Sequence, residues 1–207
     1  MKKFKTEQED FWKGGFGDQY IQRNQSHELL AANLHFFSHV LADRETVDSV
    51  LELGCNVGMN IRALKLLLPS SEITGIEINE KAALEASTIA NDVKILNESI
   101  LNHESSGTYD LVFTKGVLIH ISPDELPLVY KKMAEASSRY VMIAEYYNPT
   151  PVGIDYRGHE NRLFKRDFAG EFLQVNPEFK LVDYRFHYKK AVNFSQDDIT
   201  WFLMERK

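Results

Sequence analysis

Four residues at the ends of apolar runs form a pattern that suits a nucleotide. Glu52, Gly54 and Gly58 lie in or just after a short apolar run, residues 49–53. Glycine lets the backbone pass close to a ligand because it has no Cβ, and Glu52 can pair with a cationic group of the ligand, directly or through water. Glu77 follows Gly58 by nineteen positions, a spacing at which a carboxylate can bind both ribose hydroxyls. The pattern therefore predicts a nucleotide site.

The glycine pattern argues against two common nucleotide motifs. When a G-x-G-x-x-G dinucleotide fingerprint is laid on Gly54, Asn56 and Met59 stand where two glycines are needed. A P-loop would need a Gly-Lys-Ser/Thr ending, which the sequence lacks. The pattern instead resembles motif I of class I S-adenosylmethionine-dependent methyltransferases. Their middle glycine is Asn56 here, a mild departure because asparagine tolerates left-handed backbone angles.

The elements that must position these residues alternate along the chain. Apolar runs predict strands at 49–53, 73–78, 93–96, 109–114, 140–146, 180–188 and 200–205. Helices are predicted at 26–42, 59–68, 80–89, 122–137 and 165–174. The fourth helix has Ser122 as N-cap, Pro123 in its first turn and a capping-box Glu125. We predict an α/β fold, Rossmann-like and doubly wound, with a mostly parallel seven-stranded sheet and an antiparallel C-terminal edge hairpin.

The length of 207 residues fits one domain. We expect residues 1–207 to form a single methyltransferase domain, with an N-terminal cap and helix at 1–45 and a Rossmann-like core at 46–207. Within that core, residues 147–167 are long for a connection between a strand and a helix, which favours a substrate-binding loop.

Composition and charge exclude several classes of function. The chain is 43% hydrophobic and 26% charged, with a net charge of −6, which argues against a phosphate-backbone surface and therefore against nucleic acid as a partner. A single cysteine, Cys55, excludes an intrachain disulfide and predicts a reducing, cytoplasmic location. No apolar run is long enough for a membrane span, so no membrane partner is expected. The oligomeric state is not predicted.

Several further stretches resemble one small family, the pseudaminic acid biosynthesis-associated methylases. The resemblance covers nearly the whole chain and lies in residues 11–20 with Arg23 and Asn24, 113–120, 145–151, 156–159 and 164–171. It implies an S-adenosylmethionine-dependent enzyme and a genomic role beside nonulosonic-acid sugar pathways.

The class pattern assigns a cofactor role to each matching position. Glu52, Gly54 and Gly58 would line the methionine part of S-adenosylmethionine, Glu77 would hold the ribose, and Ile78 would contact the adenine. The full predicted cofactor set is Trp12, Tyr20, Arg23, Glu52, Gly54, Cys55, Asn56, Gly58, Glu77, Ile78, Glu98, Ser99 and Lys115. In that set, Glu98 or Ser99 would edge the adenine and Lys115 would face the cleft. Trp12, Tyr20 and Arg23 would form a lid, with Arg23 near the cofactor carboxylate, or an aromatic cap that packs on the sheet.

Methyl transfer is an in-line displacement, in which the protein mainly supplies alignment. A general base is needed only for a protonated amine or a hydroxyl of high pKa. His120 and Tyr146 are the predicted catalytic residues, and His120 is the better placed because its ordinary pKa lies near neutrality. A histidine that is merely hydrogen-bonded at a strand-to-helix corner is the alternative. No metal is predicted, because His35 and His39 lack the glutamate of His-Glu-x-x-His.

The predicted substrate loop has a local basic excess. Its cations can receive a carboxylate or phosphate, so the acceptor is predicted to be a small anionic metabolite such as an acidic sugar or sugar nucleotide. The predicted substrate-binding residues are Tyr147, Tyr156, Arg157, His159, Lys165 and Arg166. The alternatives are a protein methyltransferase, a non-catalytic S-adenosylmethionine-binding partner subunit and, last, a nicotinamide oxidoreductase.

Overall fold

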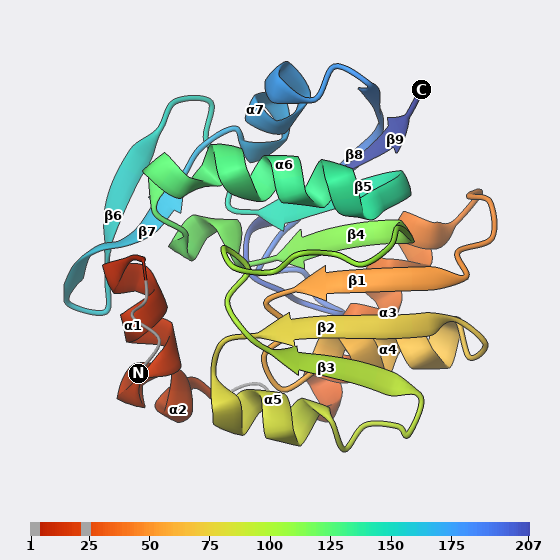
Figure 1. The fold of residues 1–207 in the computed structure, drawn as a ribbon, viewed down its shortest axis with the longest axis horizontal. Helices are drawn as coiled ribbons and strands as arrows, with labels where there is room; N and C mark the ends of the chain where they lie inside the picture. Colours follow the sequence, from red (N-terminus) through yellow and green to blue (C-terminus); the bar gives the residue numbers. More distant parts are fainter. Residues whose placement is uncertain (1–4, 22–25) are drawn as a thin grey trace.

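The computed structural model of the chain describes residues 5–21 and 26–207 and is built around one mixed sheet (Figure 1). The seven strands lie in the order β3-β2-β1-β4-β5-β9-β8. The pairs formed by β1 to β5 are parallel, whereas β9 is antiparallel to both β5 and β8. The strand bounds are β1 Ser49–Leu53, β2 Glu72–Glu77, β3 Val93–Asn97, β4 Tyr109–Lys115, β5 Ser137–Glu145, β8 Phe179–His187 and β9 Ile199–Arg206.

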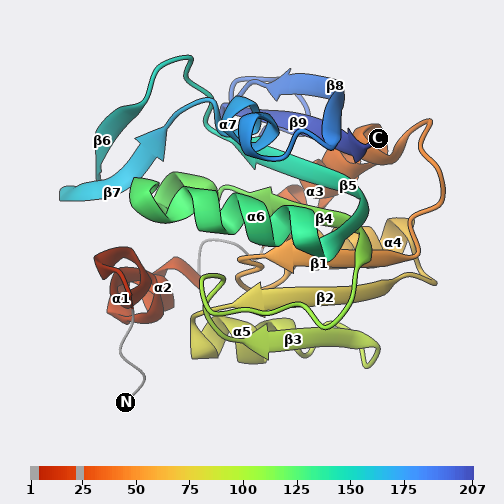
Figure 2. The ribbon, with the colours of Figure 1, turned by 45° about the horizontal axis from the view of Figure 1, so that its top comes forward.

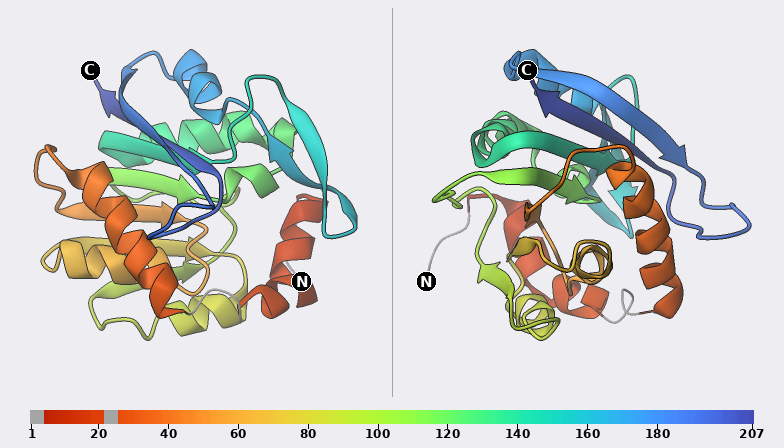
Figure 3. Two further views of the ribbon diagram at one scale, coloured as in Figure 1. Left: turned by 180° about the vertical axis from the view of Figure 1, so that it is seen from behind. Right: turned by 90° about the vertical axis from the view of Figure 1, so that its right-hand side faces the viewer.

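Helices cover both faces of this sheet, and each side has its own apolar core. α3 (His27–Leu41), α4 (Met59–Leu67) and α5 (Glu80–Ala86) contribute to the core on one face. α6 (Leu126–Ala136) and α7 (Phe168–Val175) pack on the other, as the two views of Figure 3 show. The predicted doubly wound, Rossmann-like fold with an antiparallel C-terminal hairpin is therefore confirmed.

The segment predicted as a loop at 147–167 is largely a β-hairpin, which corrects that expectation. β6 (Val152–Tyr156) pairs antiparallel with β7 (His159–Lys165) in a separate two-stranded sheet. Arg157 and Gly158 form its tip with φ angles of 53° and 83°. Both angles are positive, as a two-residue hairpin turn that matches the twist of its strands requires. The basic residues are thus held on a defined element.

Two helix starts also differ from the sequence-based expectations. The side chain of Ser122 makes no capping hydrogen bond, and residues Pro123–Glu125 form a 3-10 turn, η2, before α6 begins at Leu126. Pro127 occupies the first turn of α6, where its missing N–H costs little. α7 begins at Phe168, because Asp167 acts as the N-cap and accepts a hydrogen bond from the Gly170 N–H at 2.9 Å.

The N-terminal segment forms two short helices, α1 (Glu7–Lys13) and α2 (Gly15–Ile21). The strands β1 and β2 end on the side of the molecule where α1, α2 and the β6–β7 hairpin lie (Figure 2). α1 is fixed to the hairpin by an ion pair between Glu7 and Arg162, 3.2 Å apart, and by a hydrogen bond from Gln8 to the Asn161 carbonyl. Within the two described ranges, no helix has both the length and the apolar character that a bilayer crossing demands.

Candidate active site

A cavity of about 420 Å³ opens at the carboxyl ends of the central strands, beneath α1, α2 and the hairpin. Ligands of open α/β sheets bind at this position. Of the residues predicted from the sequence, thirteen line the cavity: Trp12, Tyr20, Gly54, Cys55, Asn56, Glu77, Ile78, Ser99, Lys115, His120, Tyr146, Tyr156 and Arg157. The topology thus gathers side chains from the whole length of the chain around one space.

The turn after β1 has the backbone shape that its residue types suit. Gly54, Asn56 and Gly58 adopt φ angles of 80°, 48° and 77°, and asparagine is among the few non-glycine residues that enter this region readily. A Cβ at Gly54 would approach Cγ2 of Val117 to 2.7 Å. Gly58 lies outside the cavity wall as N-cap of α4, where a Cβ would meet Cδ1 of Ile89 at 2.2 Å. Gly54 therefore shapes the ligand space, whereas Gly58 lets α4 pack closely.

Glu77 connects the turns that follow β1 and β2. Its carboxylate accepts hydrogen bonds from the Asn56 N–H at 2.8 Å and the Asn79 N–H at 2.7 Å. The side chain is buried at the cavity wall, and this burial raises the pKa of Glu77. A carboxylate fixed at both oxygens keeps further lone pairs for the hydroxyls of a ligand.

Glu52 of β1 and Lys115 at the end of β4 are ionisable groups on neighbouring strands. Glu52 lies behind the wall, where Oε1 accepts a hydrogen bond from Asn60 Nδ2 at 2.6 Å; its Oε2 has no partner among the described residues. Lys115 lines the cavity and donates to Asn33 Oδ1 at 3.2 Å. Burial raises the pKa of Glu52 and lowers that of Lys115. Asn60 and Lys115 line the cavity directly, whereas Glu52 is connected to it only through its hydrogen bond with Asn60.

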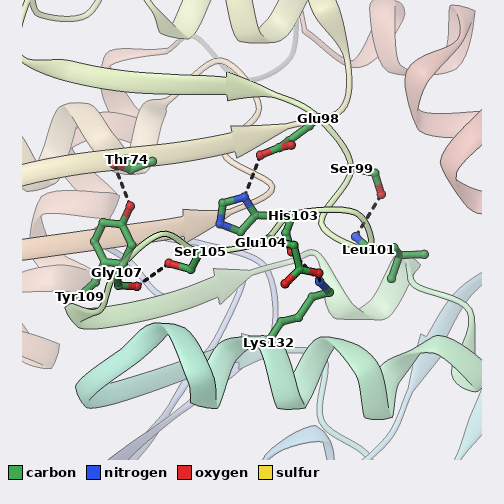
Figure 4. Close-up of polar contacts among 10 residues, drawn as sticks. All are labelled: Thr74, Glu98, Ser99, Leu101, His103, Glu104, Ser105, Gly107, Tyr109 and Lys132. Carbon is green, nitrogen blue, oxygen red and sulfur yellow. Dashed lines mark hydrogen bonds and ion pairs between the residues drawn. The ribbon is translucent and has the colours of Figure 1, made fainter. Parts of the chain in front are cut away.

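The segment after β3 presents Ser99, and not Glu98, to the cavity. Glu98 forms a 2.7 Å contact with Nδ1 of His103, whereas Ser99 Oγ accepts the Leu101 N–H at 3.1 Å (Figure 4). Ser99 also donates to the carboxylate of Glu9, which itself lines the cavity. Glu9 was missed in the sequence, although Thr6 and Glu9 form a capping box that a spacing search can find.

Aromatic rings roof the cavity. The ring of Trp12 lies with its centroid 4.6 Å from that of His120, 5.3 Å from Tyr20 and 6.4 Å from Tyr156. These residues come from α1, α2, the segment after β4 and the hairpin. Arg23, the third predicted lid residue, lies outside the described residues. The roof is thus assembled by helices and a hairpin that are far apart in the sequence.

His120 is held in its neutral form. Its Nδ1 lies 2.6 Å from the Arg162 carbonyl oxygen, and because a carbonyl only accepts, Nδ1 carries the proton. Nε2 is then left as a hydrogen-bond acceptor. Burial lowers the pKa of His120 to about 4, so His120 suits the orientation of a hydroxyl better than the removal of a proton at neutral pH.

The buried neutral state of His120 predicts a loss of stability in acid. Its folded pKa lies below the ordinary value of 6.5, so the unfolded chain binds the proton more tightly, and the contribution of His120 is lost as the pH falls from about 6.5 to about 4. At about 1.4 kcal/mol per pKa unit, the loss is about 3 kcal/mol. Urea titrations of the wild type and His120→Asn across this range should show a difference in unfolding free energy that shrinks as the pH falls. A constant difference would contradict the assignment.

Tyr146 forms a pair with a residue that the sequence analysis missed. Its hydroxyl donates to Asp197 Oδ2 at 2.9 Å, and both residues line the cavity. Burial and the nearby Asp197 carboxylate raise the pKa of Tyr146. Asp197 lies in the connection between β8 and β9, and no motif or spacing marks it in the sequence. The pair can accept one hydrogen bond from a ligand and orient it.

Only two of the six predicted substrate-binding residues line the cavity, Tyr156 and Arg157. The Arg157 guanidinium lies 5.4 Å from the Tyr156 ring centroid and forms no ion pair with any residue in the described part of the chain. The other four are engaged elsewhere: Tyr147 packs on Phe202, His159 on Phe11, Lys165 lies over the Tyr146 ring, and Arg166 pairs with Glu171 at 2.6 Å. Arg157 is thus the hairpin cation that faces the ligand space.

Comparisons with known proteins agree with this geometry. Residues 51–138 match the sequence model of a family described as "Methyltransferase domain". No curated protein sequence matches the chain. The fold is similar to magnesium protoporphyrin IX methyltransferase from Synechocystis PCC 6803 with bound S-adenosylhomocysteine (TM-score 0.68, 14% identity, 96% of this chain and 97% of that chain). It is also similar to a SAM-dependent methyltransferase from Leishmania major (TM-score 0.73, 13% identity, 96% and 86%) and to the plantazolicin methyltransferase BpumL (TM-score 0.67, 13%, 97% and 94%).

At these identities the structural similarities establish the fold, and the matched domain identifies the enzyme class. The prediction of a methyltransferase is confirmed, and S-adenosylmethionine is the cofactor of that class.

Proposed function

We propose that this chain, with a methyltransferase domain at residues 51–138 on a Rossmann-like fold, transfers the methyl group of S-adenosylmethionine to a small anionic metabolite, a nonulosonic-acid sugar or sugar nucleotide. The observation that carries the proposal is that Glu77, at the end of β2, and Arg157, at the hairpin tip, both line the wall of the same cavity. The resemblance to the pseudaminic acid-associated methylases supports the acceptor class, and the lone Cys55 supports a cytoplasmic location.

The residues present suit the cofactor. Glu77 is proposed to accept hydrogen bonds from the ribose hydroxyls, with Ile78 and Ser99 beside the adenine. Lys115 is proposed to bind the carboxylate of the methionine part, since its ammonium donates to only one described residue, Asn33, and keeps further N–H groups for a ligand. When bound, the cofactor supplies an electrophilic methyl group. The protein then has to align an acceptor with it and to exclude water.

The acceptor side of the cavity supplies recognition and orientation. Arg157 is proposed to bind the anionic group, because a guanidinium matches a carboxylate or phosphate in two parallel hydrogen bonds. His120 Nε2 is proposed to accept a hydrogen bond from the acceptor hydroxyl, and the Tyr146–Asp197 pair to take a second. Trp12 and Tyr156 provide apolar ring faces for the body of the acceptor.

Calorimetric titration of nucleotide-free protein with S-adenosylmethionine, S-adenosylhomocysteine and NAD tests the cofactor first. We expect micromolar binding of the two sulfur nucleotides and none of NAD. Labelled methyl transfer to acidic sugars and nucleotide sugars then tests the acceptor, with peptides as the comparison. Cofactor binding with transfer only to peptides would favour a protein methyltransferase. Binding without transfer to any acceptor would favour a non-catalytic subunit.

Arg157→Ala should raise the KM for an anionic acceptor by about tenfold to a hundredfold and change the affinity for S-adenosylmethionine little, because one charge-assisted contact is worth about 1.5–3 kcal/mol. Steady-state kinetics with both substrates varied measure this. Arg139→Ala is the matched control, since Arg139 pairs with Glu45 on the surface, outside the cavity. An unchanged acceptor KM in Arg157→Ala would refute the assigned role.

A further inference from the structure

β8 is an edge strand of the main sheet, and an uncovered aromatic strip runs along its second half and onto the residue that follows it. Tyr184, Phe186 and Tyr188 are 64%, 55% and 51% exposed. They alternate along the extended chain, so they lie on one face, and Tyr184 stacks on Phe202 of β9 with ring centroids 5.9 Å apart. We call these three residues the β8 strip.

The strip is exposed because α7 covers only the start of β8. Phe172 of α7 packs on Phe179, at the first position of the strand, with ring centroids 5.2 Å apart. A bulge between Leu181 and Asp183 then shifts the register against β9. Figure 3 shows β8 at the border of the sheet, beyond β9. Apolar rings that line up along an open strand edge form a surface at which another strand can pair.

The charges at the two ends of the strip are opposite in sign. Asp183 precedes it, at the sheet edge, and Lys189 follows it, directly after β8. Within one copy Asp183 pairs with Arg44 at 2.5 Å and Lys189 with Asp198 at 3.4 Å, so a contact between copies would add to these pairs. When two such strands lie antiparallel with Phe186 opposite Phe186, Tyr184 of one faces Tyr188 of the other, and Asp183 faces Lys189. Arg185 then faces His187, whose pKa burial lowers to about 4, so no like charges oppose each other at neutral pH.

We propose that β8 is the interface through which two copies of this chain form a symmetric dimer, with the two β8 strands antiparallel and Phe186 on the two-fold axis. Such an interface is isologous, so each copy supplies both the acidic and the basic end. The ring faces of the two strips provide the apolar burial, and the two Asp183–Lys189 pairs set the direction.

Sedimentation velocity of the full chain from about 1 to about 200 µM tests the proposal, because the dimer fraction must rise with concentration. We expect Phe186→Lys to weaken the dimer at least about a hundredfold, since two ammonium groups would meet on the axis. Leu84→Lys is the matched control: Leu84 is 71% exposed on α5, and the dimer should persist. A wild type that stays monomeric throughout, or a Phe186→Lys variant that dimerises like the wild type, would overturn the proposal.

A charge exchange tests the antiparallel direction. Asp183→Lys and Lys189→Glu should each dimerise more weakly than the wild type, because each places like charges opposite each other in both pairs. An equimolar mixture of the two variants should form a heterodimer, since every pair is then of opposite sign. Asp183 also pairs with Arg44 and Lys189 with Asp198, so circular dichroism must show that both variants are folded. If both variants are folded and their mixture fails to associate, this register is refuted. The Phe186→Lys experiment does not depend on either charge variant.

Discussion

Glu77→Ala should weaken the binding of S-adenosylmethionine at least about a hundredfold. Two effects combine in this variant. The cofactor loses the acceptor proposed for its ribose, and the N–H groups of Asn56 and Asn79 lose theirs. Hydrogen bonds to a charged group are worth about 1.5–3 kcal/mol each, so losing two at the ribose alone gives this magnitude. Calorimetric titration of variant and wild type measures it directly.

Glu98→Ala is the matched control for this experiment. Glu98 follows β3 and is one of the two residues, with Ser99, predicted to edge the adenine, yet it contacts His103 (Figure 4) and does not line the cavity. We expect the affinity of Glu98→Ala for S-adenosylmethionine to stay within about threefold of the wild type, because the Glu98 side chain contacts His103 and lies outside the cavity. If the folded Glu77→Ala variant bound S-adenosylmethionine as tightly as the wild type, the proposed ribose contact would be wrong.

Glu145→Ala should destabilise the folded protein by about 3 kcal/mol and lower kcat about tenfold or more. Glu145 is buried at the end of β5, and its carboxylate accepts the N–H groups of Val117 and Leu118 at 3.0 Å and of Ile119 at 3.4 Å. Each buried donor left without a partner costs about 1–3 kcal/mol. The same turn carries His120, so its distortion misplaces the group proposed to orient the acceptor.

Urea unfolding and steady-state kinetics of three variants separate these effects. Glu145→Gln keeps an oxygen for Val117 and Leu118 and should lose about half as much stability as Glu145→Ala. Glu205→Ala removes a carboxylate that pairs with Lys180 across the sheet edge and should cost about 0–1 kcal/mol with an unchanged kcat. A Glu145→Ala variant as stable and as active as the wild type would show that the turn after β4 keeps its conformation without the Glu145 carboxylate.

The sequence predicted the sheet well because strand and helix patterns are local. The seven predicted strands correspond to β1 to β5, β8 and β9, with ends that differ by a few residues. The segment at 147–167 was predicted as a loop and is a hairpin. Its turn was not recognised because the first positive-φ position is occupied by Arg157, whereas the usual residues there are asparagine, aspartate and glycine. The helix expected from Ser122 begins at Leu126, because a 3-10 turn precedes it.

The sequence by itself determined the alternation of strands and helices, the positive-φ turn at Gly54 to Gly58 and the carboxylate of Glu77, because each depends on residue type and short spacing. Tertiary structure decided which polar groups face the cavity. Arg162 is paired with Glu7, 155 positions away, and Ser99 with Glu9, 90 positions away. Charged groups and hydrogen-bond donors pair with groups that are close in space, whatever their distance in sequence. Only the fold could therefore show that Arg157 lines the cavity and that burial keeps His120 neutral.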